Sequence, residues 1–168
     1  MKTFDFSAYL SPFTWRYGSD EMRRIFSEKH KYELWRKIWI TLAEAQHQAG
    51  LVTKEELDDL KKNEKDIDIE KIFELEKDTK HDVVAAIKEY AEKSKTGGGK
   101  IHLGATSMDI VDNADMIRIK ESLEIIEKKV VVILNLLAEK IEEYSDFPCL
   151  GYTHLQPAQP VTFGHHLM

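Results

Sequence analysis

The sequence predicts an all-α fold, with a small helical domain over residues 1–99 and the beginning of a long-helix bundle domain over residues 100–168. Apolar residues recur every three or four positions along most of the chain, which is the period of an amphipathic helix. One such run, from Met108 to Tyr144, would exceed about 50 Å at ~1.5 Å per residue. Few small domains use a helix of that length alone. We expect strands only as short pieces near the loops.

The amino-acid composition limits the classes of molecule that this protein is expected to bind. A net charge of -6 argues against a nucleic-acid groove or an anionic membrane as the main partner, although a local basic pocket can still bind a small anion. Cys149 is the only cysteine, which excludes an intrachain disulfide and a thiolate metal cluster and fits a reducing compartment. No window is apolar enough to span a bilayer, and the N-terminus lacks a signal-peptide pattern. We therefore expect a cytoplasmic protein.

The earliest helix start that the sequence indicates is Ser19, which is followed by Asp20 and Glu21 at the positive end of the helix dipole. Arg16 and Tyr17 then lie in the loop just before this helix. A guanidinium and free backbone N–H groups at such a place can hold an anion such as phosphate. The alternative is a surface Arg beside a packed Tyr, and these two residues alone favour that alternative.

A long amphipathic helix is predicted from Ser27 to Ala49, and Gly50 is suited to end it. Trp35 and Trp39 flank its apolar stripe, and tryptophans in such a pattern belong to a core far more often than to a ligand site. The stripe consists of Leu34, Ile38, Leu42 and Ala45.

Two shorter helices follow. Thr53 and Glu56 have the spacing of a capping box, which opens a polar helix that ends near Asn63. The next helix begins at about Ile69 and continues through Glu76. Its end leads directly into a cluster of ionisable residues.

This cluster, Lys80, His81 and Asp82, precedes an apolar helical segment from Val83 to Ala91. Three adjacent ionisable side chains at a helix junction can line a binding site. The alternative for Asp82 is a plain helix cap, and charged residues at helix junctions are common. The cluster alone is therefore weak evidence for a site.

The loop that joins the predicted domains contains Gly97–Gly99, which we expect to be flexible and which lacks the Gly-Lys-Ser/Thr pattern of a phosphate loop. It leads to the segment Ile101–Asp109. Thr106 or Ser107 is a natural N-cap for the long helix, and hydroxyls and N–H groups there would face an anion brought near. The alternative is a cap with no ligand.

The long helix has apolar residues on more than one side, so it requires neighbours, as in a bundle or an oligomer core. Its main seam comprises Ile119, Leu123, Ile126, Val130, Ile133, Leu137, Ile141 and Tyr144. A further helix begins near Pro160 and is still amphipathic at Met168, where the sequence stops. We infer that the sequence is a fragment of a longer protein.

Between these helices lies the uncharged stretch Gly151–Gly164. Pro157 and Pro160 exclude a continuous helix there, so the backbone from Leu155 to Gln159 should be extended or turning. His154 on this loop can act as a general acid or base, because an imidazole changes charge near neutral pH. The alternative is a His that only caps a turn.

Four segments in this order and spacing make the chain resemble the N-terminal portion of the adenylosuccinate lyase family, within the fumarase/aspartase superfamily. The segments are Arg16-Tyr17, Lys80-His81-Asp82, Gly104-Ala-Thr-Ser107 and Thr153-His-Leu-Gln-Pro-Ala-Gln159. The resemblance extends from about Ser11 to Met168. Each motif alone is weak, but their order is specific.

The resemblance implies a homotetrameric enzyme of purine and AMP biosynthesis that releases fumarate from adenylosuccinate, and from the related succinylated carboxamide ribotide, by β-elimination. Neither a metal nor an organic cofactor is implied. Arg16 and Tyr17 would contact the nucleotide, and His154 would protonate the leaving nitrogen. The site would also contain Lys80, His81 and Asp82, while Thr106 and Ser107 would bind the succinyl part. The family usually has Arg where Lys80 stands, which puts bidentate anion binding in doubt.

The family's base is a Ser on a mobile downstream loop with a Gly-Ser-Ser and Met-Pro-Lys pattern, which this sequence does not contain. We therefore expect the 168-residue chain alone to be inactive. Two alternatives remain open. One is another fumarate-releasing lyase or related enzyme of the superfamily, such as argininosuccinate lyase, fumarase or the carboxymuconate cycloisomerase. The other is a non-catalytic helical module that associates through the long seam.

Overall fold

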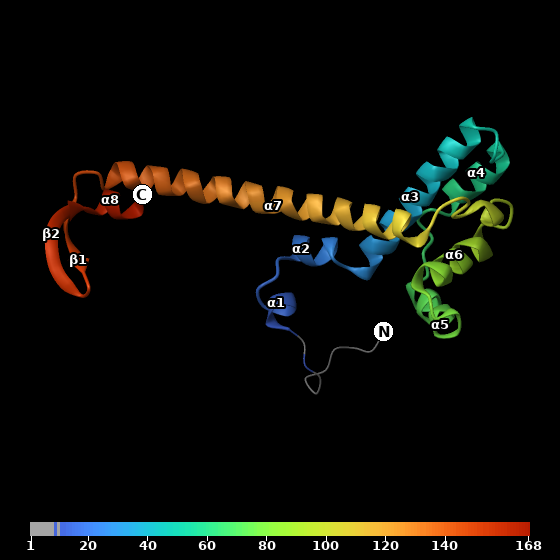
Figure 1. Ribbon diagram of the computed structural model, residues 1–168, viewed down its shortest axis with the longest axis horizontal. Helices are drawn as coiled ribbons and strands as arrows, with labels where there is room; N and C mark the ends of the chain where they lie inside the picture. The colour runs from blue at the N-terminus through green and yellow to red at the C-terminus, as the bar shows by residue number, and fades with distance from the viewer. Residues whose placement is uncertain (1–8, 10) are drawn as a thin grey trace. The chain divides into compact units, whose positions relative to one another are not determined.

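The computed structural model describes residue 9 and residues 11–168. They form helices joined by loops and one antiparallel β-hairpin (Figure 1). This confirms the all-α class, with strands confined to a short piece beside a loop. The elements in order are α1 (Pro12–Trp15), α2 (Asp20–Ile25), α3 (Glu28–Gln48), α4 (Lys54–Lys62), α5 (Ile69–Thr79), α6 (Asp82–Lys93), the 3₁₀ turn η1 (Gly98–Lys100), α7 (Ser107–Glu143), β1 (Pro148–Thr153), β2 (Gln156–Thr162) and α8 (Phe163–Leu167).

The chain divides into two compact units, one up to Glu121 and one from Ser122 to Met168. Helix α7 begins in the first unit and ends in the second. The domain boundaries predicted from the sequence, residues 1–99 and 100–168, are a separate division of the chain and remain a prediction.

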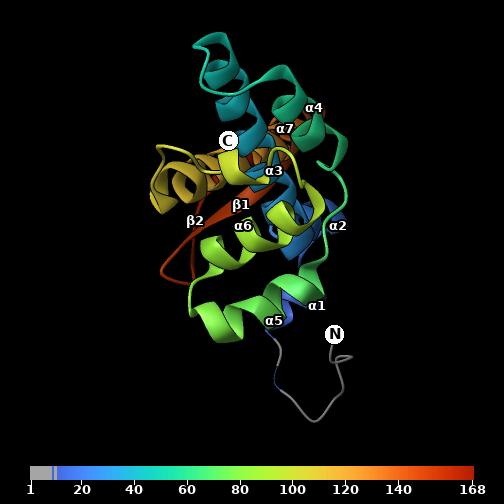
Figure 2. The ribbon, with the colours of Figure 1, turned by 90° about the vertical axis from the view of Figure 1, so that its right-hand side faces the viewer.

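The core of the first unit is organised around helix α3. Trp35 and Trp39 are both 2 % exposed and contact each other edge to face, with ring centroids 6.2 Å apart. Tyr90 of α6 is fully buried, and its ring lies 6.2 Å from that of Trp39. Helices α5 and α6 lie side by side and cover this core (Figure 2). The prediction that the tryptophans belong to the core is confirmed.

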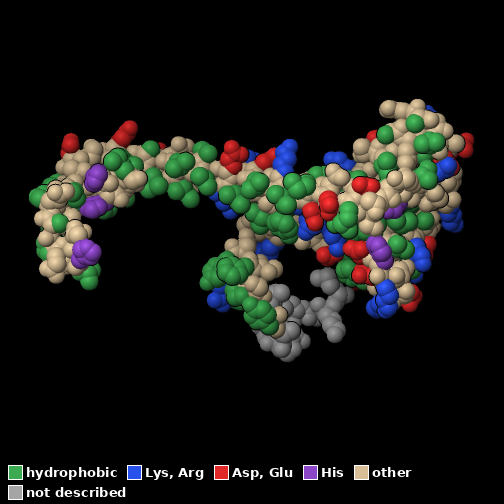
Figure 3. Space-filling view, viewed as in Figure 1, with side chains coloured by type: hydrophobic (Ala, Val, Ile, Leu, Met, Phe, Trp, Pro, Cys, Tyr) green, Lys and Arg blue, Asp and Glu red, His purple; other side chains and the backbone are tan. Residues whose placement is uncertain are grey.

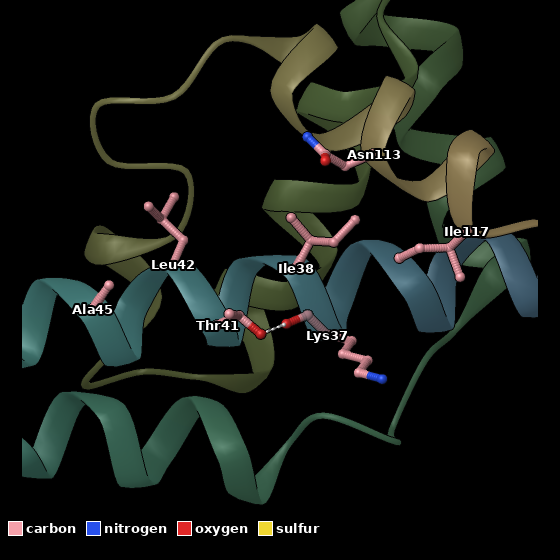
Figure 4. Close-up of a pocket in the computed structure, with 7 residues that line it drawn as sticks. All are labelled: Lys37, Ile38, Thr41, Leu42, Ala45, Asn113 and Ile117. Atoms are coloured by element: carbon pink, nitrogen blue, oxygen red, sulfur yellow. Dashed lines mark hydrogen bonds between the residues drawn. The ribbon is translucent and has the colours of Figure 1, made fainter. Parts of the chain in front are cut away.

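The apolar stripe predicted for α3 is only partly buried. Leu34 is in the core, but the other three residues of the stripe face an open pocket of about 460 Å³ between α3 and the first turns of α7 (Figure 4). The helix is rotated toward its two tryptophans, because these larger side chains remove more apolar surface from water. The pocket is lined by Lys37, Ile38, Thr41, Leu42, Ala45, Asn113 and Ile117.

Four of the predicted helix ends are confirmed, whereas the helix predicted to begin near Pro160 begins at Phe163, because Pro160 is paired with Leu150 in the hairpin. Ser19 and Ser27 each accept a hydrogen bond from the backbone N–H three residues on, at 3.2 Å. Thr53 and Glu56 make both bonds of the capping box. Gly50 follows α3 with a φ of 77°, a conformation that costs glycine little.

A buried ion pair joins α3 to α6. The side chains of Arg36 and Glu89 are 2 % and 1 % exposed, and they form a direct salt bridge. Arg36 also donates to the carbonyls of Asn63 and Asp66, and Glu89 accepts from the backbone N–H of Asp68. Burial lowers the pKa of Arg36, and the carboxylate of Glu89 opposes that shift. The pair thereby satisfies the backbone of the α4–α5 loop inside the protein.

The glycine loop before α7 is packed closely. Gly97 lies so close to α4 that an added Cβ would come within 2.3 Å of the Glu56 carbonyl oxygen. The carboxylate of Asp59 accepts from the backbone N–H groups of Thr96 and Gly97 at 2.8 and 2.9 Å. The expectation of a flexible, featureless loop is therefore corrected, since Gly97 and Gly98 permit a close approach of backbone to backbone.

In the second unit, α7 exposes apolar side chains on more than one side, as the sequence predicts. Figure 3 shows the apolar side chains along one face of this helix. Of the predicted seam, the exposed members are Ile119 in the first unit and Leu123, Ile126, Val130, Ile133 and Leu137 in the second, and Val131, Val132, Leu134 and Leu136 are exposed as well. Across residue 9 and residues 11–168, no helix combines the length and the apolar character that a membrane crossing needs.

Helix α8 follows the hairpin in the chain and packs against the end of α7. The backbone N–H of Gly164 donates to the Tyr144 carbonyl at 2.9 Å, and an added Cβ would lie 2.6 Å from the Ile141 carbonyl oxygen. The ring of Tyr144 contacts the ring of Phe163 edge to face at 5.3 Å. These contacts hold the open end of the hairpin, so the turn at residues 154–155 lies at its other end.

Candidate active site

His81 is the central residue of the predicted site in the first unit. It precedes α6 as the N-cap residue, with φ -154° and ψ 116°. The hydroxyl of Thr79 donates to the His81 carbonyl at 3.0 Å and accepts from its N–H at 3.4 Å. The turn thereby directs the imidazole toward the start of α7, where its Nε2 lies 3.5 Å from Oγ of Ser107. Two segments that the sequence analysis singled out separately are thus brought together.

Lys80 and Asp82 flank this imidazole. Lys80 ends α5 in the left-handed conformation, with φ 53°, and its side chain is exposed. Asp82 is the first residue of α6 and not its N-cap; its Oδ1 accepts from the N–H of Val83 at 2.8 Å. The same oxygen lies 3.4 Å from Nδ1 of His81. The two ring nitrogens of His81 therefore face a carboxylate and a hydroxyl.

Thr106 and Ser107 lie where α7 begins. Thr106 precedes the helix, and its N–H donates to the Asp109 carboxylate at 2.8 Å, which is one half of a capping box. Ser107 is the first helical residue. The unpaired N–H groups of a helix start carry a partial positive charge, so an anion is favoured beside these hydroxyls. The predicted N-cap position is confirmed for Thr106.

His102 belongs to the same region, although the sequence analysis did not select it. It lies in the loop before α7 with φ 64°, and its Nδ1 accepts a hydrogen bond from the indole N–H of Trp39 at 3.2 Å. Burial lowers the pKa of His102; the nearby Asp109 opposes this shift and His81 adds to it. In the sequence, the signal that could have identified His102 was its place two residues before Gly104, in the segment that leads to Thr106.

Arg16 and Tyr17 are exposed in the short loop between α1 and α2, as predicted. The Arg16 guanidinium carbon lies 4.5 Å from the ring centroid of Trp15, and the ring of Tyr17 is 6.3 Å from that of Phe13. Within the described part of the chain, no hydrogen bond or ion pair joins either residue to the His81 cluster. Their exposed side chains are available to a ligand.

His154 lies in the second unit, at the tip of the hairpin. It and Leu155 form a two-residue turn between the paired residues Thr153 and Gln156. Their φ values are 49° and 63°, which is uncommon for residues other than glycine. Both side chains are exposed. The backbone thus holds His154 in a defined and strained position, which confirms a turning backbone at this point.

The cluster in the first unit offers hydroxyls, an imidazole, a lysine and a helix N-terminus in one region. These groups donate hydrogen bonds or carry positive charge, so they suit an oxygen-rich anion. They can also stabilise negative charge that develops on a carboxyl group when a neighbouring proton is removed. The imidazole of His154 in the second unit can deliver a proton to a departing amine.

Comparisons with known proteins show which family the chain resembles. Residues 15–168 match a protein-family model described as Lyase. The chain is 44 % identical over 158 residues to adenylosuccinate lyase of Methanocaldococcus jannaschii, with 92 % of this chain and 34 % of that protein covered. It is 41 % identical over 164 residues to adenylosuccinate lyase of Saccharomyces cerevisiae, with 95 % of this chain and 34 % of that protein covered.

Among solved structures, the chain is similar to a 3-carboxy-cis,cis-muconate lactonizing enzyme from Pseudomonas putida, with a TM-score of 0.83 and 25 % sequence identity. That match covers 92 % of this chain and 37 % of the lactonizing enzyme. The chain thus spans about a third of the length of the curated relatives it matches. Because the family match extends over residues 15–168, the chain belongs to this family of lyases.

Proposed function

We propose that the complete protein is an adenylosuccinate lyase of purine biosynthesis. It eliminates fumarate from adenylosuccinate to give AMP, and acts on the succinylated carboxamide ribotide in the same way. A proton leaves the carbon beside a carboxylate, the C–N bond breaks, and the nitrogen accepts a proton. The similarity to adenylosuccinate lyases over more than nine-tenths of this chain supports the substrate.

The candidate residues take separate roles in this reaction. Arg16 and Tyr17 contact the nucleotide. Thr106 and Ser107 bind the succinyl carboxylate at the start of α7, and His154 protonates the leaving nitrogen. Lys80, His81 and Asp82 line the substrate site. We expect a cytoplasmic homotetramer that uses small-molecule substrates, with no nucleic acid or membrane as a partner.

The observation that carries the proposal is the meeting of His81 with Ser107 at the start of α7. It places an imidazole beside a hydroxyl at the first residue of a helix of 37 residues. An elimination beside a carboxylate requires such donors, because negative charge develops on that carboxyl group in the transition state. The exposed apolar surface of α7 supports assembly with further helices.

The test compares the complete protein with its His154→Ala variant in an assay of AMP and fumarate formation from adenylosuccinate. We expect activity in the complete protein, a loss of about 10²-fold or more in the variant, and an unchanged circular dichroism spectrum. Equal activity in both would remove His154 from the mechanism. The 168-residue chain alone should release no fumarate, and measurable release would contradict that expectation.

A binding experiment separates the substrate classes. If the complete protein binds a nucleotide, AMP raises its melting temperature in a concentration-dependent manner. Stabilisation by fumarate or malate, without any effect of AMP, would instead indicate another enzyme of the superfamily. Absence of an effect by all three would favour a non-catalytic helical module.

A further inference from the structure

We propose that Trp39 is a positioning residue whose indole N–H holds His102 as the tautomer with its hydrogen on Nε2, so that His102 offers a fixed N–H donor to an anionic oxygen beside α7. Trp39 lies in the middle of α3 and His102 in the loop before α7. Neither residue was selected for a catalytic role from the sequence.

The first step of the argument is the direction of the hydrogen bond. The indole nitrogen of Trp carries a hydrogen and can only donate. Trp39 Nε1 lies 3.2 Å from Nδ1 of His102, so Nδ1 must supply a lone pair. In a neutral imidazole one nitrogen carries the hydrogen and the other accepts. The hydrogen of His102 is therefore on Nε2.

The second step is that both partners are held in place. Trp39 is 2 % exposed and packs between the rings of Trp35 and Tyr90, so its indole has little freedom to rotate. The rings of Trp39 and His102 meet edge to face at an interplanar angle of 89°. The core thus fixes the orientation of the imidazole together with its tautomer.

The third step concerns the surroundings of Nε2, the ring nitrogen of His102 that Trp39 does not bond. Nδ1 faces the core, and Nε2 lies across the ring from Trp39. Asp109 and His81 act on His102 electrostatically, so the imidazole lies in the same region as Ser107. Burial lowers the pKa of His102, which favours the neutral ring. A neutral His with a fixed Nε2–H is a hydrogen-bond donor and cannot take a proton at that nitrogen.

The tautomer is tested by NMR on the full chain with ¹⁵N-labelled histidine. A His102→Asn variant identifies the His102 signals among the seven histidines. We expect Nδ1 to resonate as an unprotonated nitrogen and Nε2 as a protonated one. Replacement of Trp39 by benzothienylalanine keeps the ring size and removes the N–H, so the two shifts should move toward each other as both tautomers become populated. A protonated Nδ1 in the unaltered protein would overturn the proposal.

The matched control is Trp35→Phe. Trp35 is buried to the same extent as Trp39 and contacts it, but its indole does not bond His102. This variant should alter packing and stability while leaving the two ¹⁵N shifts of His102 unchanged. If Trp35→Phe changes the shifts as much as the benzothienylalanine variant does, packing and not the N–H sets the tautomer, and the proposal is wrong.

The role of this donor in ligand binding rests on the proposed function. In the complete protein, the benzothienylalanine variant should lower kcat/KM for adenylosuccinate by about ten-fold, the effect of one hydrogen bond to a charged group. An unchanged kcat/KM would refute the ligand role and leave the tautomer intact. Absence of turnover in the unaltered protein would contradict the proposed function, whereas the NMR result does not depend on turnover.

Discussion

Nε2 of His81 lies 3.5 Å from Oγ of Ser107, although the two residues are 26 positions apart in the chain. His81 is held by the turn between α5 and α6, and Ser107 by the first turn of α7. The contact places an imidazole beside the positive end of the longest helix in the described chain. An anion bound there would meet both groups.

Removal of the Ser107 hydroxyl tests this contact. In the complete protein, Ser107→Ala should lower kcat by about 10²-fold, because a donor aimed at developing negative charge contributes on that scale. The control is Thr41→Ala, since Thr41 is exposed on α3 and, among the residues that the structure describes, its hydroxyl bonds only the Lys37 carbonyl (Figure 4). Equal kcat values for the Ser107 variant and the unaltered enzyme would exclude this hydroxyl from the transition state.

The buried pair of Arg36 and Glu89 should be important for stability. Glu89→Gln leaves a buried guanidinium without its counter-charge, so the free energy of unfolding should fall by about 3–5 kcal/mol in urea denaturation. The exposed pair of Glu44 and Lys61 is the matched control, and Glu44→Gln should cost less than about 1 kcal/mol. Similar losses for both variants would show that burial does not set the contribution of these pairs.

His102 should make stability depend on pH. Because burial lowers its pKa in the folded state, the unfolded chain binds the proton more readily. The contribution of the neutral imidazole is complete above the unfolded pKa, near 6.5, and is lost as the pH falls below it. His102→Asn should therefore flatten the fall in unfolding free energy as the pH drops below about 6.5, as followed by urea titrations at each pH. The same slope in both proteins would mean that other groups cause it.

The hairpin turn should be strained at Leu155. A non-glycine residue in the left-handed region costs about 1 kcal/mol, and the Leu155 side chain is 92 % exposed, so it gains little from packing. Leu155→Gly should therefore increase hydrogen-exchange protection of the β1 and β2 amides by about five-fold. As a control, Val161→Gly lies in the paired part of β2 and should reduce protection. Lower protection in the Leu155 variant would show that the turn is not strained.

Helix boundaries could be predicted because their causes are local. The hydroxyls of Ser19, Ser27 and Thr53 bond N–H groups only three residues away, so a short window contains both partners. Gly50 likewise ends α3 through its own φ value. The extended or turning backbone from Leu155 to Gln159 followed from Pro157 and Pro160, which exclude a continuous helix there, but the pairing of β1 with β2 was not predicted.

Packing could not be predicted in the same way. The period of α3 indicated Leu34, Ile38, Leu42 and Ala45 as the buried stripe, yet three of these face a pocket, and Trp35 and Trp39 fill the core. A helical period shows that one face is buried but does not fix the rotation of the helix. That rotation depends on the side chains of α6, which the sequence of α3 does not contain.

The candidate site also has features that the sequence could predict and features that it could not. The sequence by itself determined the residue types and their order, from Arg16 to His154, because that chemistry is carried by short motifs. Only the tertiary structure decided that His81 meets Ser107 and that Trp39 bonds His102 across 63 positions of the chain. The physical reason is that hydrogen bonds between distant residues form only after the helices pack, and the free energy of packing is shared by the whole core.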